Sequence, residues 1–244
     1  MYAGYLFDLD GTLWRGNTLI PGAVETVRRL QDAGARIGYV TNNSTQSTEQ
    51  FVAKLTGMGF PTEGCAVKST ASGAAAYVAA MGIGSAYVVG ESGLHASIKA
   101  VAELTDESPE AVVVGLCFSF DYEKLKVAMR AIRGGASFIA TNRDVTYPME
   151  GGNLIPGAGS VVAAVAAAAE REPIVIGKPE PTMILQCLDE LGLRAEETLV
   201  VGDRLDTDIE SGQRAGCPVH LVLSGVETVA PLGMAHSLDV NGLA

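Results

Sequence analysis

The chain has 244 residues, of which 48% are hydrophobic and 18% are charged, so it can bury a sizeable core and is not intrinsically disordered. Its formal net charge of −11 argues against any general binding of nucleic acid or anionic membranes. The same charge repels phosphorylated ligands, so a phosphate site here needs a local positive field from a metal ion, a lysine or backbone N–H groups.

The first part of the chain alternates apolar runs with amphipathic segments. Residues 5–9 form an apolar run that ends in acid and glycine, which predicts a buried strand followed by a loop. Residues 21–33 have the periodicity of an amphipathic helix that stops at Gly34. A strand over 35–40 and a helix over 48–58 follow. This order predicts a parallel sheet with right-handed crossover helices.

The rest of the chain continues the alternation. The same reasoning predicts helices over residues 71–81, 122–133, 160–171, 182–191 and 209–215. It predicts strands over residues 86–89, 111–116, 138–140, 174–176, 198–201 and 219–223. The pattern is typical of an α/β protein with a doubly wound parallel sheet. The tail after Gly225 is patterned too weakly to predict the last core element.

Cysteine usage and the apolar segments indicate a cytoplasmic protein. The four cysteines form no CxxC pair and have no histidine at zinc-finger spacing, which is typical of buried, reduced thiols. The N-terminus has no basic region before its first carboxylates and so does not resemble a signal peptide. The most apolar stretch, Val161–Ala169, is far shorter than the ~20 residues that cross a bilayer. We therefore expect a cytoplasmic protein without a membrane anchor.

Polar segments follow four of the predicted strands. They are Asp8-Leu9-Asp10-Gly11-Thr12, Thr41-Asn42-Asn43-Ser44, Gly177-Lys178-Pro179 and Gly202-Asp203-Arg204-Leu205-Asp206-Thr207-Asp208. In open α/β sheets, ligands bind at the carboxyl ends of the strands. Each segment alone is an ordinary turn or helix cap, but chance does not readily place all four after strands of one sheet. We therefore predict that the four segments form one site.

The residue types in these segments suit phosphoryl transfer. A carboxylate such as Asp8 can attack phosphorus and form an acyl phosphate that water later cleaves. Asp8 and Asp203 together supply the few carboxylates that Mg²⁺ uses. If the chain turns tightly, Asp10 is placed to protonate the leaving alkoxide and then to deprotonate the water. Thr41 offers a hydroxyl and backbone N–H groups, and Lys178 a positive charge, for the phosphoryl oxygens.

The four segments resemble the four motifs of the haloacid dehalogenase-like (HAD) phosphatases, DxDGT, TNN, GKP and GDRxDTD. The long interval between the second and third motifs contains Ala140-Thr141-Asn142-Arg143-Asp144 and Pro156-Gly157-Ala158-Gly159. It resembles the subclass that includes NagD nucleotidase and 4-nitrophenyl phosphatase. The resemblance implies a Rossmann-like catalytic core over residues 1–83 and 173–244. It also implies an inserted α/β cap over residues 84–172 that shields the site from water and selects the leaving group.

The resemblance also implies a role for each motif residue. Asp8 would be the nucleophile and a metal ligand. Asp10 would be the acid/base and would give its backbone oxygen to the metal. Asp203 would bind Mg²⁺, with Asp208 supporting the site from behind the metal ligands. The phosphoryl group would be held by Thr41, Asn42 and Lys178, with Asn43 beside them. Within the cap, two residues are either turn formers or substrate-binding residues, namely Asn142 and Asp144.

These expectations describe a magnesium-dependent phosphoric monoester hydrolase that acts on a small phosphorylated metabolite through an aspartyl-phosphate intermediate. Glycerol phosphate, phosphoglycolate, nucleoside monophosphates and pyridoxal phosphate all fit a capped site, as does 4-nitrophenyl phosphate. No nucleic-acid or membrane partner is expected, and a homodimer is left open.

Three alternatives have weaker support. A phospho-receiver module also pairs an aspartate with Mg²⁺ and lysine, but it has no acid/base like Asp10 and no cap. A catalytically inactive binding protein does not need the catalytic residue types that are all present here. Dehalogenation of a haloalkanoate needs neither a second aspartate nor a metal.

Overall fold

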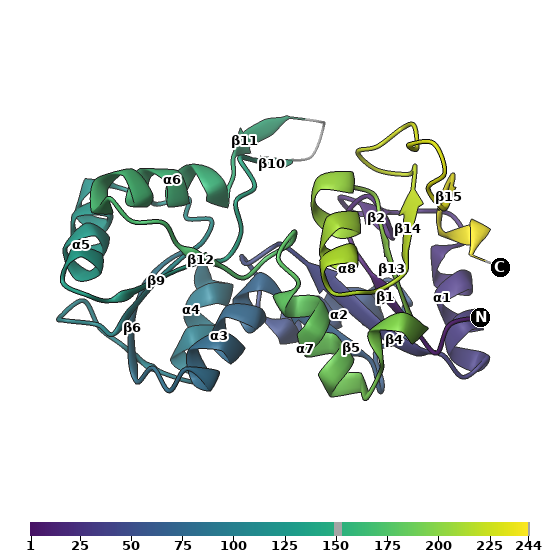
Figure 1. Ribbon diagram of the computed structural model, residues 1–244, viewed down its shortest axis with the longest axis horizontal. Coiled ribbons are helices and arrows are strands. Elements are labelled where there is room, and N and C mark those ends of the chain that lie inside the picture. The colour runs from purple at the N-terminus through teal and green to yellow at the C-terminus, as the bar shows by residue number, and fades with distance from the viewer. Residues whose placement is uncertain (149–152, 244) are drawn as a thin grey trace. The chain divides into compact units, whose positions relative to one another are not determined.

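The two ends of the chain meet in one six-stranded sheet of the computed structural model, which describes residues 1–148 and 153–243 (Figure 1). Its strands, in spatial order, are β15 (His236–Ser237), β14 (Val219–Val222), β13 (Thr198–Gly202), β1 (Gly4–Phe7), β4 (Arg36–Thr41) and β5 (Ala66–Ser69). β1 pairs in parallel with both β4 and β13, and parallel pairing continues through β14 to β15. The early strands therefore lie on one side of β1 and the late strands on the other, as in a doubly wound sheet.

Alternate residues of these strands point to opposite faces of the sheet, and helices cover both faces. The helices are α1 (Ala23–Asp32), α2 (Thr48–Gly57), α7 (Thr182–Leu191) and α8 (Glu210–Arg214). On one face, Tyr39 of β4 belongs to a core cluster that includes buried residues of α1 and α2. On the other face, Gly38 of β4 lies against Leu191 of α7, and Gly212 of α8 lies against Val200 of β13. The sheet is thus the middle layer of three.

A second, five-stranded sheet carries the middle of the chain. Its strands, in spatial order, are β12 (Ile174–Val175), β9 (Ser137–Ala140), β8 (Ala111–Val114), β6 (Ser85–Val89) and β7 (Glu103–Leu104), and all neighbours pair in parallel. Helices α5 (Tyr122–Arg133) and α6 (Ala158–Ala169) cover one face, while α3 (Thr70–Ala80) and α4 (Ser92–Lys99) cover the other (Figure 1). All four residues of β8 are buried, as expected for a strand covered on both faces. An antiparallel pair, β10 (Thr146–Pro148) and β11 (Leu154–Pro156), precedes α6.

The two sheets belong to two separate units of the chain. The first unit comprises Met1–Thr41, Glu49–Lys68 and Lys178–Ala244, and the second comprises Asn42–Thr48 and Ser69–Gly177. Compared with the predicted boundaries at 84 and 172, the second unit also takes in α3, β12 and the segment 42–48. The physical reason is local: α3 contacts α4, β12 pairs with β9, and the Gly93 N–H donates to the Thr45 carbonyl. That the units are a catalytic core and a cap stays a prediction.

One prediction about the first sheet is wrong. The sequence predicts that all four polar segments follow strands of one sheet, but β12, which precedes Lys178, is the edge strand of the second sheet. β12 has only two residues and pairs with β9 of the second unit. The chain passes into the first unit shortly after β12, and Lys178 is the first residue of that segment. The other three segments do follow β1, β4 and β13 of the six-stranded sheet.

The remaining fold predictions agree with the structure. The predicted α/β class with a doubly wound core is confirmed, and the tail supplies β15 and a short turn, η4 (Val240–Gly242). The four cysteines are free thiols, as predicted. In the described part of the chain, every helix is too short or too polar to span a bilayer. The cytoplasmic location stays a prediction.

Candidate active site

Three adjacent strands of the first sheet end at the same edge. β1 lies between β4 and β13, and its end is followed by Asp8. Thr41 is the last residue of β4 and is buried, while Asp203 directly follows β13. The chain leaves β1 toward β4 and later returns to β13 on the opposite side. The end of β1 is therefore the switch point of the sheet, where ligands bind in doubly wound folds.

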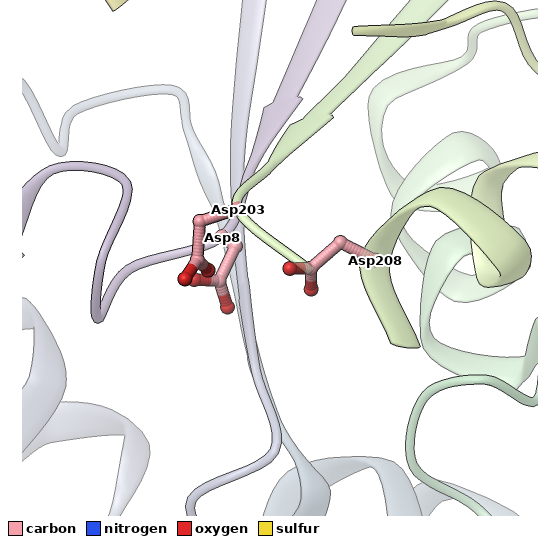
Figure 2. A group of neighbouring side chains, drawn as sticks. All are labelled: Asp8, Asp203 and Asp208. Carbon is pink, nitrogen blue, oxygen red and sulfur yellow. The ribbon is translucent and has the colours of Figure 1, made fainter. Parts of the chain in front are cut away.

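Three aspartates meet at this switch point. Each of Asp8, Asp203 and Asp208 offers a carboxylate oxygen, and these oxygens lie within 4.8 Å of one another (Figure 2). Asp203 and Asp208 are 1% and 2% exposed, whereas Asp8 is half-buried. Asp8 is therefore the member of the group with the most exposed surface, as a nucleophile requires.

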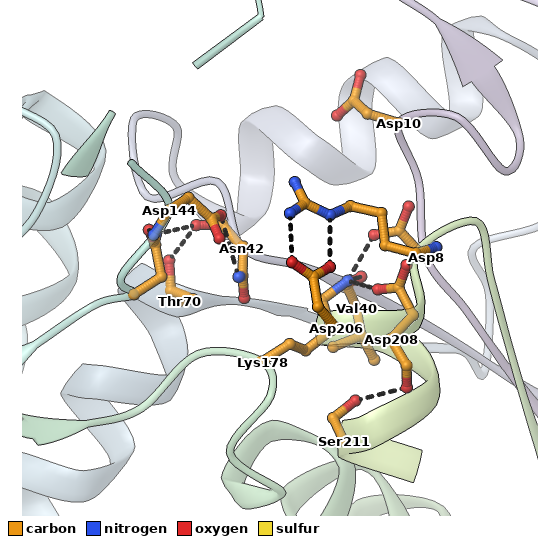
Figure 3. A network of polar contacts seen from close by, with 12 residues as sticks. Asp8, Asp10, Val40, Asn42, Thr70, Asp144, Lys178, Asp206, Asp208 and Ser211 are labelled. Carbon is orange, nitrogen blue, oxygen red and sulfur yellow. Dashed lines mark hydrogen bonds and ion pairs between the residues drawn. The ribbon is translucent and has the colours of Figure 1, made fainter. Parts of the chain in front are cut away.

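Lys178 lies among these carboxylates and joins them to β4. Its Nζ donates to Asp8 Oδ1 at 2.5 Å, to Asp208 Oδ1 at 2.6 Å and to the Val40 carbonyl at 3.2 Å (Figure 3). An ammonium group has three donors, and these contacts occupy three. In this structure Lys178 thus compensates two aspartates, and a phosphoryl oxygen would have to take the place of one of its acceptors.

Both carboxylate oxygens of Asp208 accept hydrogen bonds. Oδ1 accepts from Lys178, and Oδ2 accepts from the backbone N–H of Arg204 at 3.1 Å. Its position comes from a single π-helical turn, η3 (Leu205–Ile209), which lies directly after the β13 loop. Gly202 permits this arrangement because a Cβ there would overlap the Asp208 side chain. Asp208 therefore orients Lys178, and its role behind the metal ligands stays a prediction.

Burial and mutual repulsion shift the pKa values of this group. Burial, followed by repulsion from Asp208, raises the pKa of Asp8 well above its ordinary range. Burial and Asp208 likewise raise the pKa of Asp203, to about 6. Burial alone would lower the pKa of Lys178, but Asp208 and Asp8 raise it above its usual range, so the lysine stays charged. The single lysine therefore does not supply enough positive charge to offset the burial and mutual repulsion of the three carboxylates.

A divalent cation would balance the net negative charge of this group. Three carboxylates beside one ammonium group leave two formal negative charges in a largely buried site. Their ligand atoms are all carboxylate oxygens, and Mg²⁺ prefers oxygen ligands and uses few carboxylates. The residues present therefore fit a magnesium ion. Asp8 and Asp203 would bind it directly, because both oxygens of Asp208 are already engaged.

The Asp10 side chain lies apart from those of Asp8 and Asp208 (Figure 3). Its Oδ1 accepts a hydrogen bond of 2.8 Å from the indole Nε1 of Trp14. The loop folds back so that the Gly11 N–H donates to the Trp14 carbonyl at 2.7 Å, and Gly11 has a φ of 92° that favours glycine. Although Asp10 is exposed, desolvation by the protein around its carboxyl group raises its pKa.

Trp14 has a role that the sequence does not reveal. Trp14 lies just past the loop that carries Asp8 and Asp10, and the structure buries it completely in the core cluster of the first unit. A buried indole N–H needs an acceptor, and Asp10 is that acceptor. Lys54 of α2 stands 4.5 Å from the centre of the Trp14 ring, so a cation–π contact steadies the indole.

In the second unit, the segment after β4 forms a polar network of its own. The Asn42 carbonyl accepts from Thr70 Oγ1 and from Asn142 Nδ2, both at 2.7 Å. Asn42 Nδ2 donates to Asp144 Oδ2 at 3.1 Å, and the Asp144 N–H donates to Asn142 Oδ1 at 3.0 Å (Figure 3). These bonds fit the turn-forming role of Asn142 and Asp144, and a substrate-binding role for either residue stays a prediction. The two residues shape a turn, and they hold the motif residue Asn42.

Asn43 is also tied down within the second unit. Its Oδ1 accepts from the backbone N–H and the hydroxyl of Thr45, at 2.8 and 2.7 Å. Its Nδ2 donates to the Tyr147 hydroxyl at 3.2 Å. The phosphoryl-binding roles predicted for Thr41, Asn42 and Asn43 stay predictions.

Comparison with known proteins identifies the family. A haloacid dehalogenase-like hydrolase model matches residues 5–102, and a HAD-hydrolase-like model matches residues 175–239. Dihydroxyacetone phosphatase of Corynebacterium glutamicum is 39% identical over 231 residues, covering 93% of this chain and 83% of the relative. 5'-Nucleotidase YutF of Bacillus subtilis is 40% identical over 227 residues, covering 92% of this chain and 88% of the relative.

Solved structures agree with these relatives. The p-nitrophenyl phosphatase from Archaeoglobus fulgidus has a TM-score of 0.91 and 31% identity, covering 99% of this chain and 98% of its own. Glycerol phosphate phosphatase from Mycobacterium tuberculosis, solved in complex with magnesium, has a TM-score of 0.88 and 34% identity, covering 99% and 77%. The chain therefore belongs to the haloacid dehalogenase-like hydrolases, in their NagD-like phosphatase branch. It is a phosphoric monoester hydrolase.

Proposed function

We propose that the chain is a magnesium-dependent phosphatase that hydrolyses small phosphorylated metabolites through an aspartyl-phosphate on Asp8. One observation carries the proposal: a half-buried aspartate at the switch point is bonded to a buried lysine and adjoins two further aspartates. Such a group can attack phosphorus, while its neighbours balance the charge. A cytoplasmic location suits substrates of this kind.

The first chemical step transfers the phosphoryl group to the protein. A carboxylate oxygen of Asp8 forms a bond to phosphorus as the bond between phosphorus and the substrate alcohol breaks. Asp10, in its protonated form, gives a proton to the departing alkoxide. A bound Mg²⁺ supplies positive charge that neutralises the phosphoryl oxygens. Lys178 remains protonated and holds Asp8 in place through its 2.5 Å hydrogen bond.

The second step returns Asp8 to its starting state. Water attacks phosphorus, and Asp10, now deprotonated, takes a proton from that water. The bond between Asp8 and phosphorus breaks, which releases inorganic phosphate and restores the carboxylate. One carboxyl group thus serves both steps by alternating its protonation, and the raised pKa of Asp10 helps it to begin protonated.

We further propose that the first unit is the catalytic core and the second unit is the specificity cap. The relatives named above act on dihydroxyacetone phosphate, a 5'-nucleotide and glycerol phosphate. These substrates share a phosphomonoester but differ in the leaving group. A core that binds phosphate and a separate unit that recognises the alcohol would account for this range.

Phosphate release tests the proposal directly. We expect activity on small alkyl phosphates and on 4-nitrophenyl phosphate with Mg²⁺, and none after exhaustive chelation. We expect Ca²⁺ to inhibit, because it prefers more ligands and looser geometry than Mg²⁺. The measurement is phosphate released from a panel of metabolites under each metal condition. Full activity in the chelated protein, or none on any phosphomonoester, contradicts the proposal.

Changes in the second unit test the specificity assignment. We expect Asp144→Ala and Asn142→Ala to alter the ranking of natural substrates while changing turnover of 4-nitrophenyl phosphate by less than about threefold, because that leaving group needs little recognition. Arg143→Ala is the matched control, since its exposed side chain pairs with Glu172. The measurement is kcat/KM on each substrate. Equal losses on all substrates assign these residues to the common phosphate-transfer machinery instead.

A further inference from the structure

The chain segment that follows β14 closes around the Asp203 carboxylate. The backbone N–H of Val226 donates to Asp203 Oδ2 at 2.7 Å, and the N–H of Glu227 donates to the Asp203 carbonyl at 3.2 Å. Asp203 is 1% exposed, so these donors replace water that the buried group has lost. The tail thus supplies one backbone donor that fixes the orientation of this carboxylate and a second that holds the Asp203 backbone.

Position 225 leaves no room for a side chain and is occupied by glycine. A Cβ on Gly225 would overlap the Asp203 carboxylate and lie 2.6 Å from the Asp203 Cβ, a separation that real Cβ atoms essentially never show. Its φ is not among the positive values of this chain, so alanine could adopt the backbone conformation. What excludes a side chain at Gly225 is therefore Asp203 itself.

A second glycine also lies against the carboxylate. A Cβ on Gly11 would lie 2.6 Å from the Asp203 Cγ, and the φ of 92° at Gly11 disfavours a side chain in addition. Gly11 belongs to the loop that carries Asp8. The Asp203 carboxylate thus lies against one glycine of the catalytic loop and one glycine of the tail.

Hydrogen bonds join the two glycine-bearing segments to each other. The buried Ser224 donates from Oγ to the Gly11 carbonyl at 2.8 Å. Arg15 Nε donates to the Ser224 carbonyl at 2.6 Å. Together with the Val226 contact, these bonds form a closed connection from the catalytic loop through the tail to Asp203.

We propose that Ser224, Gly225 and Val226 form a clamp that positions Asp203 for binding Mg²⁺, and that Gly225 is a positioning residue of the phosphatase. The proposal rests on the proposed function, because it takes Asp203 to be a metal ligand. Ser224 locks the clamp to the catalytic loop, so that Asp203 and Asp8 keep the spacing that one ion requires. Partners that orient metal ligands from behind are typically worth about 10–100-fold in metal affinity or activity.

Direct binding of the metal tests the clamp without any reaction. Isothermal titration of the purified protein with Mg²⁺ alone should give a Kd that rises about 10–100-fold in Gly225→Ala. A smaller rise is expected in Ser224→Ala, which removes the bond to Gly11 but adds no atoms. The matched control is Gly57→Ala, because a Cβ there meets nothing within 4 Å. Raising the Mg²⁺ concentration should restore kcat in both clamp variants.

The outcomes separate the clamp from the proposed function. If the wild-type protein binds no Mg²⁺, the metal assignment and the clamp both fail. If the wild type binds Mg²⁺ and a folded Gly225→Ala protein binds it with the same Kd, only the clamp is overturned. Should Gly225→Ala fail to fold by circular dichroism, Ser224→Ala decides, and an unchanged Kd in that variant overturns the clamp.

Discussion

Asp8→Asn is expected to abolish phosphatase activity and leave the protein folded. Asparagine keeps the size of the side chain and an oxygen that can accept from Lys178, but it cannot form the acyl phosphate. Loss of a covalent route costs several decades in rate, so less than about 1% of wild-type kcat should survive. The measurement is phosphate release under saturating substrate and Mg²⁺. More than that residual activity would show that Asp8 is not the nucleophile.

The control for this change lies in the acidic loop after β13. Asp206 is exposed and pairs with Arg204 at 3.0 Å, so Asp206→Asn removes a carboxylate without touching the three-aspartate group. It should keep close to full activity. Folding of Asp8→Asn should also be intact, because burial and Asp208 raise the pKa of Asp8 and a neutral side chain therefore fits its site at lower cost. Equal thermal unfolding midpoints in chelator would check this.

The parts of the site that follow strands could be predicted from the sequence. Asp8, Thr41 and Asp203 each end an apolar run, and parallel strands bring their carboxyl ends to one edge whatever their neighbours are. The grouping of Asp8, Asp203 and Asp208 is then set by one sheet and one turn. Local pattern and one general rule of α/β sheets were sufficient here.

Other parts depend on long-range contacts that a single sequence does not encode visibly. β12 has two residues, and only its pairing with β9 decides which sheet it joins. The ring of Trp14 is buried in the core. Its hydrogen bond to Asp10 depends on the loop between the two residues folding back on itself. The φ of Gly225 is one that other residues also adopt. The need for glycine there comes entirely from contact with the Asp203 side chain, which lies far from it in the sequence.

Asp10→Asn is expected to separate the two chemical steps. Departure of an alkoxide is poor without a proton donor, and attack of water on the phosphorylated aspartate is poor without a base. General acid–base help is typically worth about 10²–10⁴ in rate, so turnover of an alkyl phosphate should fall by that order. The substituted amide still offers an oxygen to Trp14 Nε1, so the side chain keeps its anchor.

The two substrates should respond differently to this change. The 4-nitrophenolate ion leaves without a proton, so phosphorylation of Asp8 should survive in Asp10→Asn while hydrolysis of the acyl phosphate does not. The variant should then accumulate phosphorylated protein, visible by intact-protein mass spectrometry after an acid quench, with a burst of 4-nitrophenol before slow turnover. Wild-type protein should show no such accumulation, because with Asp10 present the acyl phosphate is hydrolysed as fast as it forms.

The same experiment distinguishes a phosphatase from a phospho-receiver. A receiver holds its phosphoryl group, so wild-type protein that keeps a long-lived phosphorylated Asp8 and releases little phosphate would support the receiver alternative. Another result would show that Asp10 does not take part in proton transfer. If Asp10→Asn loses activity equally on both substrates and no phosphorylated protein appears, then Asp10 acts on the structure of the loop, through Trp14, or on the metal site. Two results together assign Asp10 to both proton transfers: a burst with 4-nitrophenyl phosphate that lacks steady turnover, and loss of Asp8 phosphorylation by an alkyl phosphate.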